Sequence, residues 1–482
     1  MNACKKRQFH ILLICVINLV ILIMSLFLTP TGDDWGYCTV PRINEEWVTT
    51  SRPFDVLYGT LLGKIPFAFP ALNHILVVVA HCISGIALYL IATRIMEIKN
   101  KRALLFSIVF AIGSTCCATV LSIDSLNQSW SLCFGVVGIY AYMRFSEKPI
   151  VKTVVYLISA LLASLCKECG IVFFLFIPLF DLQFKGFKAA WKQVLINYVL
   201  GGMVGLLYLH FVSSVKETSG FSIVNAIKNT IIHIGFSVLQ FDTVSFFGYG
   251  KMVLPIVTVV LSLPLLFFIA KALIQHLVKK DFTVLFLGLL TLISTFPQNL
   301  MSGIQEMNSY PTVFFAVLLF AYLCKDWNRK TLYCVFTPYL AAALIAGGIK
   351  YHSMYKHSVQ SQEILDRIEQ QIGHLSPERI KVFPINIFNE DSYGVFVFSP
   401  SGTLGYGHAV KSIYGYEPEV ELTYYHNRTD KTIIGSTDST LIDLPYDEFI
   451  ETLKEYARDE IENNDFDLCL IMDSDCNVIV VN

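Results

Sequence analysis

The feature that most constrains this chain is a succession of long apolar stretches along its first 350 residues. A helix that crosses a bilayer needs about 20 mostly apolar residues. Soluble domains rarely combine 54% hydrophobic residues with only 15% charged ones. We predict a polytopic all-α membrane protein with about eleven transmembrane helices, near residues 10–28, 71–93, 103–122, 129–145, 152–166, 170–182, 193–213, 252–274, 282–300, 310–324 and 331–349.

Lysine and arginine are distributed unevenly between the predicted loops. If the N-terminus lies inside, the inner loops hold 19 of these residues and the outer loops hold 7. Positively charged loops stay on the cytoplasmic side of a membrane. We therefore expect a multi-pass protein of the bacterial cytoplasmic membrane, with its N-terminus inside. The long loop at about 29–70 and everything after about residue 350 are then outside.

This orientation can be tested with a reporter that is active only in the cytoplasm. When the reporter is fused after Asn482, we expect no signal, whereas a fusion after a predicted inner loop should be active. A strong signal from the Asn482 fusion would reverse the orientation and place the first loop on the cytoplasmic side.

The chain changes character near residue 350. Residues 1–350 carry a net charge of +12, and residues 351–482 carry −14. Such an asymmetry marks a domain boundary. We predict a multi-span domain at 1–350 and a small acidic extracytoplasmic α/β domain at 351–482. Within the second domain the patterns predict helices at 358–373 and 445–461, strands at 379–385 and 393–399, and a hairpin at 467–481 with a three-residue turn.

Two adjacent carboxylates, Asp33 and Asp34, follow directly after the first apolar stretch, which ends at Leu28. One interpretation is that they are solvated loop residues. The other is that one of them is a general base for a reaction on a lipid-borne substrate, while its neighbour orients the acceptor or binds a divalent cation. The later stretch 51–65, "SRPFDVLYGTLLGKI", can form an amphipathic helix on the membrane surface.

Taken together, these motifs resemble the GT-C class of membrane glycosyltransferases. The resemblance rests on the acidic pair, on "SRPFDVLY", and on "LNHILVVVAH" at the start of the second span. It extends to "LLASLCKECGIVFF", which is similar to an outer "KE-x-G" turn, and to "QNLMSGIQEMNSYPTVFFAVLLF" before a late span. It covers roughly residues 10–325. The chain departs from the class near Glu306, where related sequences often have an adjacent arginine.

The resemblance implies sugar transfer from a polyprenyl-phosphate donor to a cell-surface glycan or a lipid-linked acceptor, by an inverting hexosyltransferase. Asp33 or Asp34 would be the catalytic base, and Asp33, which follows the turn-forming Gly32, is slightly preferred. A sugar that leaves a phosphate passes through an oxocarbenium-like state, and the acceptor hydroxyl needs a base within about 3 Å. The departing phosphate is a stable anion, so it needs a cation rather than an acid.

Other residues are candidates for the remaining roles. Arginine suits a two-pronged phosphate contact, and lysine offers a point charge. Competing interpretations are a lipid anchor for Arg52, a local ion pair for Lys167, a solvated loop residue for Asp124 and a helix-packing hydrogen bond for His74. The candidates are Arg52, Lys167 and Lys64 for the donor phosphate; Asp124, Glu168, His74 and Glu306 for positioning; and Asp33, Asp34 and Asp124 for a divalent cation, the one cofactor that the sequence suggests.

A different class of function is a transporter or flippase of a lipid-linked or polar solute. Such proteins usually contain repeated halves with broken spans at matching positions, and this sequence shows no repeat. A polysaccharide polymerase would also use lipid-linked sugars. The charged first loop favours the transferase. The expected partners are the polyprenyl-phosphate sugar, the bilayer and the acceptor, and nothing in the sequence suggests nucleic acid.

Overall fold

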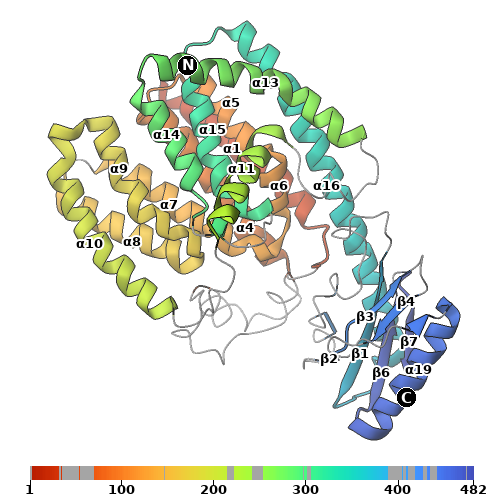
Figure 1. Cartoon of the computed structure of the whole chain (residues 1–482). Coiled ribbons are helices and arrows are strands. Elements are labelled where there is room, and N and C mark those ends of the chain that lie inside the picture. Colours follow the sequence, from red (N-terminus) through yellow and green to blue (C-terminus); the bar gives the residue numbers. More distant parts are fainter. Residues whose placement is uncertain are drawn as a thin grey trace.

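The computed structural model shows a large helical bundle joined to a small sheet unit (Figure 1). The N-terminus and the sheet unit lie at opposite ends of the molecule (Figure 1). We call the end of the bundle nearer the sheet unit the sheet-side end. The structure describes residues 3–31, 34, 54, 70–145, 147–213, 222–240, 253–296, 298–300, 306–388, 404, 409–410, 418–426, 431–434, 442–443, 445–473 and 475–482.

The bundle is built from α-helices with short 3₁₀ turns between them. The 3₁₀ turns are η1 (Ile123–Ser125), η2 (Glu168–Val172), η3 (Gln298–Leu300) and η4 (Glu306–Ser309). The α-helices are α1 (Ala3–Ser25), α4 (Pro70–Arg94), α5 (Asn100–Ile112), α6 (Ser114–Leu121), α7 (Leu126–Arg144), α8 (Pro149–Cys166), α9 (Phe173–Lys185), α10 (Phe187–Ser213), α11 (Ile223–Leu239), α13 (Val253–Val278), α14 (Phe282–Ile293), α15 (Tyr310–Leu323) and α16 (Arg329–Ile372).

Six helices within the described residues are long and apolar enough to cross a membrane, and there are seven if the bent pair α5 and α6 forms one span. Three further apolar helices, α11, α14 and α15, have 17 residues or fewer. The chain is thus a polytopic all-α membrane protein, as predicted. The count of about eleven spans stays a prediction, because length and composition alone do not decide the shorter helices.

Helix α15 lies at the centre of the bundle. Every residue from Tyr310 to Leu323 except Leu319 is buried. Its aromatic residues pack against those of neighbouring helices, for example Phe314 edge-on to Phe110 of α5 and Phe315 edge-on to Phe176 of α9. A helix that is apolar on all sides is expected in such a place. The core of the bundle is therefore largely aromatic.

The predicted span at 103–122 is a bent pair of helices. The axes of α5 and α6 meet at 51°, with Gly113 in an extended conformation between them. The bend leaves the first N–H groups of α6 without partners inside the helix. The side chain of Gln240, at the end of α11, accepts a hydrogen bond from the Ser114 N–H at 2.8 Å and donates one to the Tyr339 hydroxyl of α16 at 2.7 Å.

Helix α11 was not among the predicted spans, and its apolar side chains face outward while its polar ones are buried. Ile223 and Ile227 are 78% and 60% exposed, whereas Asn229 and His233 are buried. In a membrane protein, apolar side chains face lipid and polar ones face protein or a cavity. The asparagine, lysine and histidine in its sequence lower the mean hydropathy, but they do not prevent the helix from packing in the bundle.

The last helix, α16, is 44 residues long and continues from the bundle into the sheet unit (Figure 1). The predicted helix at 358–373 is therefore the end of α16 rather than a separate element. The predicted boundary between residues 350 and 351 falls inside this helix. The division into two domains at that point stays a prediction.

The sheet unit contains a mixed sheet with strand order β5-β4-β3-β1-β6-β7, and β2 pairs with β1 beside this path. Strand β1 is parallel to β2, β3 and β6, whereas β3–β4, β4–β5 and β6–β7 are antiparallel. The elements are β1 (Ile380–Phe388), β2 (Glu419–Val420), β3 (Thr423–His426), β4 (Lys431–Ile434), β5 (Ile442–Asp443), α19 (Tyr446–Asn464), β6 (Leu468–Met472) and β7 (Val478–Val481).

Three predictions for this unit are confirmed: the strand at 379–385, the helix at 445–461 and the hairpin at 467–481. The three-residue turn is wrong, because Met472 pairs with Val478 and five residues connect the strands. Cys469 pairs with Val481, so it does not face Cys476, and both cysteines are free. The strand at 393–399 lies outside the described residues.

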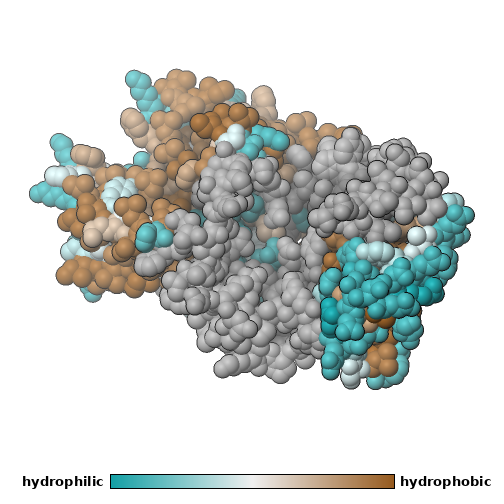
Figure 2. All heavy atoms as spheres, turned by 60° about the horizontal axis from the view of Figure 1, so that its bottom comes forward, coloured by the Kyte–Doolittle hydropathy of each residue, from teal (hydrophilic) through white to brown (hydrophobic). Residues whose placement is uncertain are grey.

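Helices cover both faces of the sheet. Leu468 and Leu470 of β6 pack against the end of α16, while Cys469 and Ile471 pack against α19. Successive residues of a strand point to opposite faces, so a strand covered on both sides is apolar throughout. On the face shown in Figure 2, hydrophobic residues dominate the coloured surface of the bundle, and hydrophilic ones cover most of the coloured surface of the sheet unit.

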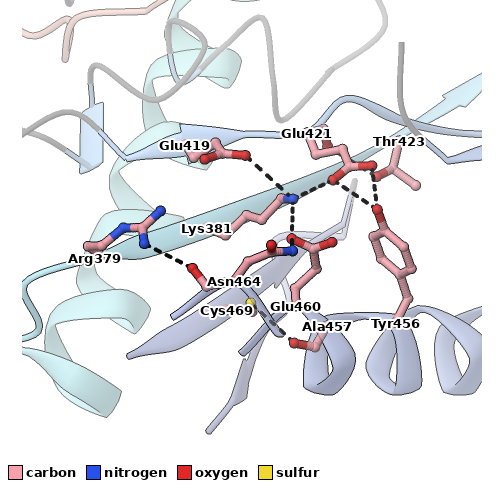
Figure 3. A network of polar contacts seen from close by, with 10 residues as sticks. All are labelled: Arg379, Lys381, Glu419, Glu421, Thr423, Tyr456, Ala457, Glu460, Asn464 and Cys469. Carbon is pink, nitrogen blue, oxygen red and sulfur yellow. Dashed lines mark hydrogen bonds and ion pairs between the residues drawn. The ribbon is translucent and has the colours of Figure 1, made fainter. Parts of the chain in front are cut away.

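A buried lysine on β1 joins the sheet to α19 (Figure 3). Only 6% of the Lys381 side chain is exposed, and its Nζ lies 2.6 Å from Glu460, 2.8 Å from Glu421 and 3.5 Å from Glu419. The Tyr456 hydroxyl also donates to Glu421 at 3.1 Å. Part of the negative charge of residues 351–482 therefore lies inside the sheet unit, because Glu421 and Glu460 are largely buried around the Lys381 cation.

Candidate functional site

Asp34 is a buried carboxylate just beyond the end of α1. Only 4% of its surface is exposed, and its N–H donates to the Thr31 carbonyl at 3.2 Å. Its Oδ1 accepts hydrogen bonds from the Ser122 hydroxyl at 2.9 Å and from the Asp124 N–H at 2.7 Å. The alternative that both acids are solvated loop residues is therefore wrong for Asp34.

The local structure explains why an acid is held here. Ser122 is extended, and η1 begins immediately after it and leads into α7. The first N–H groups of a helical segment lack internal partners and carry a partial positive charge. Asp34 supplies the missing acceptor from a segment 90 residues earlier in the chain. It therefore fastens the end of α1 to the beginning of α7.

The surroundings also change the acidity of Asp34. Burial raises its pKa from 3.8 to about 7, and the charge of the nearby Asp124 carboxylate acts in the same direction. The hydrogen bonds from the Asp124 N–H and the Ser122 hydroxyl oppose this rise. A general base works best when its pKa lies near the working pH. Asp34 therefore combines a fixed position with an acidity that suits proton transfer.

The beginning of α7 is an unusually polar surface inside the bundle. Buried polar groups in a membrane protein are costly unless they are paired or functional. The Ser131 hydroxyl donates to the Ala163 carbonyl of α8 at 2.9 Å, and Gln128 contacts the Cys169 sulfur of η2 at 3.5 Å. The buried polar residues of this surface are Ser125, Asn127, Gln128, Ser129 and Ser131.

The "KE-x-G" segment forms the tight turn between α8 and α9. Lys167 is extended and ends α8, and the Gly170 N–H donates back to the Lys167 carbonyl at 2.8 Å. A Cβ atom on Gly170 would lie 2.1 Å from the Ala163 carbonyl oxygen, so the turn requires glycine. Lys167 itself is only 7% exposed. This turn meets α7 near Gln128, so it lies at the same sheet-side end as Asp34.

The two histidines of α4 have different surroundings. His81 is held by the Tyr310 hydroxyl at 2.7 Å and by the Ala111 carbonyl at 3.2 Å. His74 is 1% exposed, and neither of its ring nitrogens has a hydrogen-bond partner among the described residues, although the Leu28 carbonyl is nearby. His81 thus makes hydrogen bonds that join α4 to α5 and α15, whereas His74 lies beside the end of α1, near the Leu28 carbonyl.

Sequence reasoning missed the polar contribution of α11. The His233 ring contacts the Ser309 hydroxyl at 2.6 Å, and the Asn229 amide donates to the Asn299 carbonyl at 3.0 Å. Together with Gln240, these residues connect α11 to η3, η4, α6 and α16. The sequence did contain a signal for this contribution, because the polar residues of 223–239 recur every three to four positions, as residues on one face of a helix do.

Of the remaining predicted site residues, two begin 3₁₀ turns and three lie outside the described residues. Asp33, Arg52 and Lys64 lie outside the described residues. Glu306 begins η4, and Glu168 begins η2. Within the described ranges, no three histidine, cysteine, aspartate or glutamate side chains come close enough together to hold one metal ion. Because Asp33 is outside those ranges, the suggested cation at Asp33, Asp34 and Asp124 stays a prediction.

No protein-family model matches this sequence, and no curated protein matches it. Among solved structures, the chain is similar to ArnT from Cupriavidus metallidurans, whose crystal structure contains bound undecaprenyl phosphate. The two chains have a TM-score of 0.50 and a sequence identity of 12%, over 96% of this chain and 92% of ArnT. The two chains share a fold, and this likeness supports the GT-C-like fold that the sequence motifs predicted.

Proposed function

We propose that this protein transfers a hexosyl group from a polyprenyl-phosphate donor to a cell-surface glycan or lipid-linked acceptor at the outer face of the membrane. The observation that carries the proposal is the buried Asp34 carboxylate, which lies just beyond the end of α1 and is held there by hydrogen bonds from Ser122 and Asp124. The fold shared with ArnT, a protein that binds undecaprenyl phosphate, supports a polyprenyl donor.

In the proposed reaction, Asp34 takes the proton from the acceptor hydroxyl as that oxygen attacks the anomeric carbon of the sugar. The bond between this carbon and the phosphate oxygen breaks, and both of its electrons leave with polyprenyl phosphate. Attack from the face opposite the phosphate inverts the anomeric centre. Asp33 orients the acceptor or holds a cation, unless it is itself the base. The two acids are thus assigned complementary roles.

The departing phosphate requires positive charge, and three basic residues are candidates. Lys167 is the one within the described residues, and the turn that carries it is packed against the beginning of α7, where Asp34 is also held. Arg52 and Lys64 belong to the first loop. Asp124 and the hydroxyls of Ser125 and Ser129 provide further polar groups at this end of the bundle, which would position sugar hydroxyls through hydrogen bonds.

The proposal predicts a characteristic pH dependence of transfer. A base with a pKa of about 7 is protonated and inactive at lower pH, so kcat/KM should rise with pH and level off above about 7. Removing the Asp124 charge should shift this rise to lower pH, because that charge raises the pKa of Asp34. The measurement is transfer from labelled polyprenyl-phosphate sugar between pH 5 and 9 for the wild type and Asp124→Asn. A rate independent of pH would exclude Asp34 as the base.

A further inference from the structure

A groove of about 530 Å³ lies between the end of α1 and the part of α16 that leaves the bundle. It is separate from the contacts around Asp34. The end of α1 forms one side through two residues, and eight residues of α16 form the other. The groove is lined by Phe27, Thr29, Tyr355, Ser358, Val359, Gln362, Glu363, Asp366, Arg367 and Gln370.

The α16 residues of the groove form one stripe along the helix. They recur at intervals of three and four from Tyr355 to Gln370, the spacing of a single helix face. At 1.5 Å per residue, this stripe is about 22 Å long. Ile364 and Ile368, on another face of the same turns, are buried in the core of the sheet unit. The groove therefore follows α16 from the bundle to the sheet unit.

The two ends of the groove differ in polarity. At the bundle end, Phe27, Tyr355 and Val359 are 67%, 43% and 46% exposed. Toward the sheet unit, the lining consists of amide, carboxylate and guanidinium side chains, from Gln362 to Gln370. Such a gradient matches a ligand with an apolar part at the membrane and a polar part beyond it. The groove is thus shaped for an amphipathic molecule.

The charges of the groove indicate which polar group it accepts. Arg367 is the lining cation, and its guanidinium donates to Glu363 at 2.6 Å and to the Cys476 carbonyl at 2.8 Å. Asp366 accepts a hydrogen bond from Gln362 at 2.7 Å. The groove thus presents two carboxylates and one guanidinium that is already paired, and this excess of negative charge disfavours a phosphate group. Amide and carboxylate groups can instead hydrogen-bond the hydroxyls of an uncharged sugar.

The groove is also connected to Asp34 through a short piece of chain. The Thr29 N–H donates to the Ser358 hydroxyl at 2.5 Å, and the Ser361 hydroxyl donates to the Pro30 carbonyl at 3.5 Å. The chain reaches Asp34 only five residues after Thr29. A ligand in the groove therefore lies against the same segment that carries the buried carboxylate.

We infer that this groove binds the acceptor, and that the acceptor is an uncharged, lipid-anchored glycan. Its sugar chain lies along Gln362, Asp366 and Gln370, and its lipid end lies against Phe27 and Tyr355. The inference rests on the proposed function, since it assigns the acceptor of that reaction. It separates the two substrates, because the donor phosphate is directed to Lys167, on the turn beside α7, and not to this acidic groove.

A labelling experiment tests binding without requiring catalysis. Gln370→Cys places a thiol in the groove, and Glu369→Cys places one on the neighbouring exposed position outside it. Labelling by a maleimide is followed by mass spectrometry on the full-length protein in detergent, with the Glu369→Cys variant as the reference. The probes are the neutral lipid-anchored envelope glycan of the source cells and undecaprenyl phosphate. We expect the glycan alone to slow labelling at position 370 at least threefold, without effect at position 369.

Transfer kinetics provide the second measurement. Gln362→Ala and Asp366→Ala should each raise the acceptor concentration for half-maximal rate by up to about tenfold, since each loses roughly one hydrogen bond to the glycan. The donor concentration for half-maximal rate should not change, and Glu369→Gln should behave as wild type. Protection of position 370 by undecaprenyl phosphate, or by neither probe, overturns the inference. Protection by the glycan in a protein without transfer activity would support glycan binding in the groove and refute the transferase.

Discussion

Replacing Asp34 by asparagine should lower the rate of sugar transfer by about 10²–10⁴-fold, the usual cost of losing a general base. Asparagine has nearly the same shape, and its amide oxygen can still accept the hydrogen bonds from Ser122 and the Asp124 N–H. It cannot take a proton. Membrane insertion should be unchanged, because Asp34 lies beyond the end of α1, and an uncharged side chain is easier to bury.

The measurement is transfer from labelled polyprenyl-phosphate sugar by membranes that contain equal amounts of each variant. Asp124→Asn serves as a comparison rather than a neutral control, since it removes a carboxylate proposed to position sugar hydroxyls while keeping the backbone N–H that contacts Asp34. Asp33→Asn decides between the two adjacent acids. If Asp33→Asn is inactive and Asp34→Asn retains activity, Asp34 is a helix cap and Asp33 the base. Near-normal turnover of both variants would remove the chemical basis of the proposed function.

Replacing Lys381 by methionine should destabilise the sheet unit by about 3–5 kcal/mol, the usual cost of removing one partner from a buried ion pair. Methionine fills a similar volume, but it leaves Glu421 and Glu460 facing each other without a cation. The matched control is Lys454→Met on α19. Lys454 pairs with the exposed Glu451 at 2.7 Å, and an exposed pair of this kind contributes about 0–1 kcal/mol.

The difference in stability between the two variants would be measured by thermal unfolding of the purified protein, with the exchange of amide hydrogens in the sheet strands as the readout. The pKa of Glu460 is lowered by Lys381, so its contribution is present above the ordinary value of 4.5 and is lost as pH falls through the lowered value. The pKa of Lys381 is raised by Glu421 and Glu460, so its contribution is lost only at strongly alkaline pH. Equal stability of Lys381→Met and Lys454→Met at pH 7 would show that the network contributes little.

The sequence predicted elements whose own residues carry a strong local pattern. The apolar stretches marked α1, α4, α8 and α16, and the alternation in 467–481 marked the last hairpin, because hydropathy and period reflect burial directly. Helix α11 was missed, and the partners that satisfy its polar residues, such as Ser309 for His233, lie on other elements and cannot be found from its own sequence.

The candidate site was predicted only in part, for a similar reason. The position of Asp34 after the first span suggested a role, yet its pairing with Ser122 joins residues 88 positions apart. No periodicity connects such a pair. The ion pairs of Lys381 could not be predicted either, since its three carboxylate partners come from other parts of the chain. The net charge of −14 for residues 351–482 does not indicate that some of these carboxylates are buried.

Because α16 is one continuous helix, the number of residues in it sets both the distance and the rotation between the bundle and the sheet unit. Each residue of an α-helix turns everything beyond it by about 100° and advances it by 1.5 Å. A single residue inserted between Lys350 and Tyr355 would rotate the whole sheet unit by more than a quarter of a turn relative to Asp34. Seven residues, which make nearly two full turns, would restore its facing. An insertion there would keep the facing of the sheet unit only at lengths near whole numbers of turns, such as seven or eleven residues. It would still move Ser358 and Ser361 along the helix axis, away from Thr29 and Pro30.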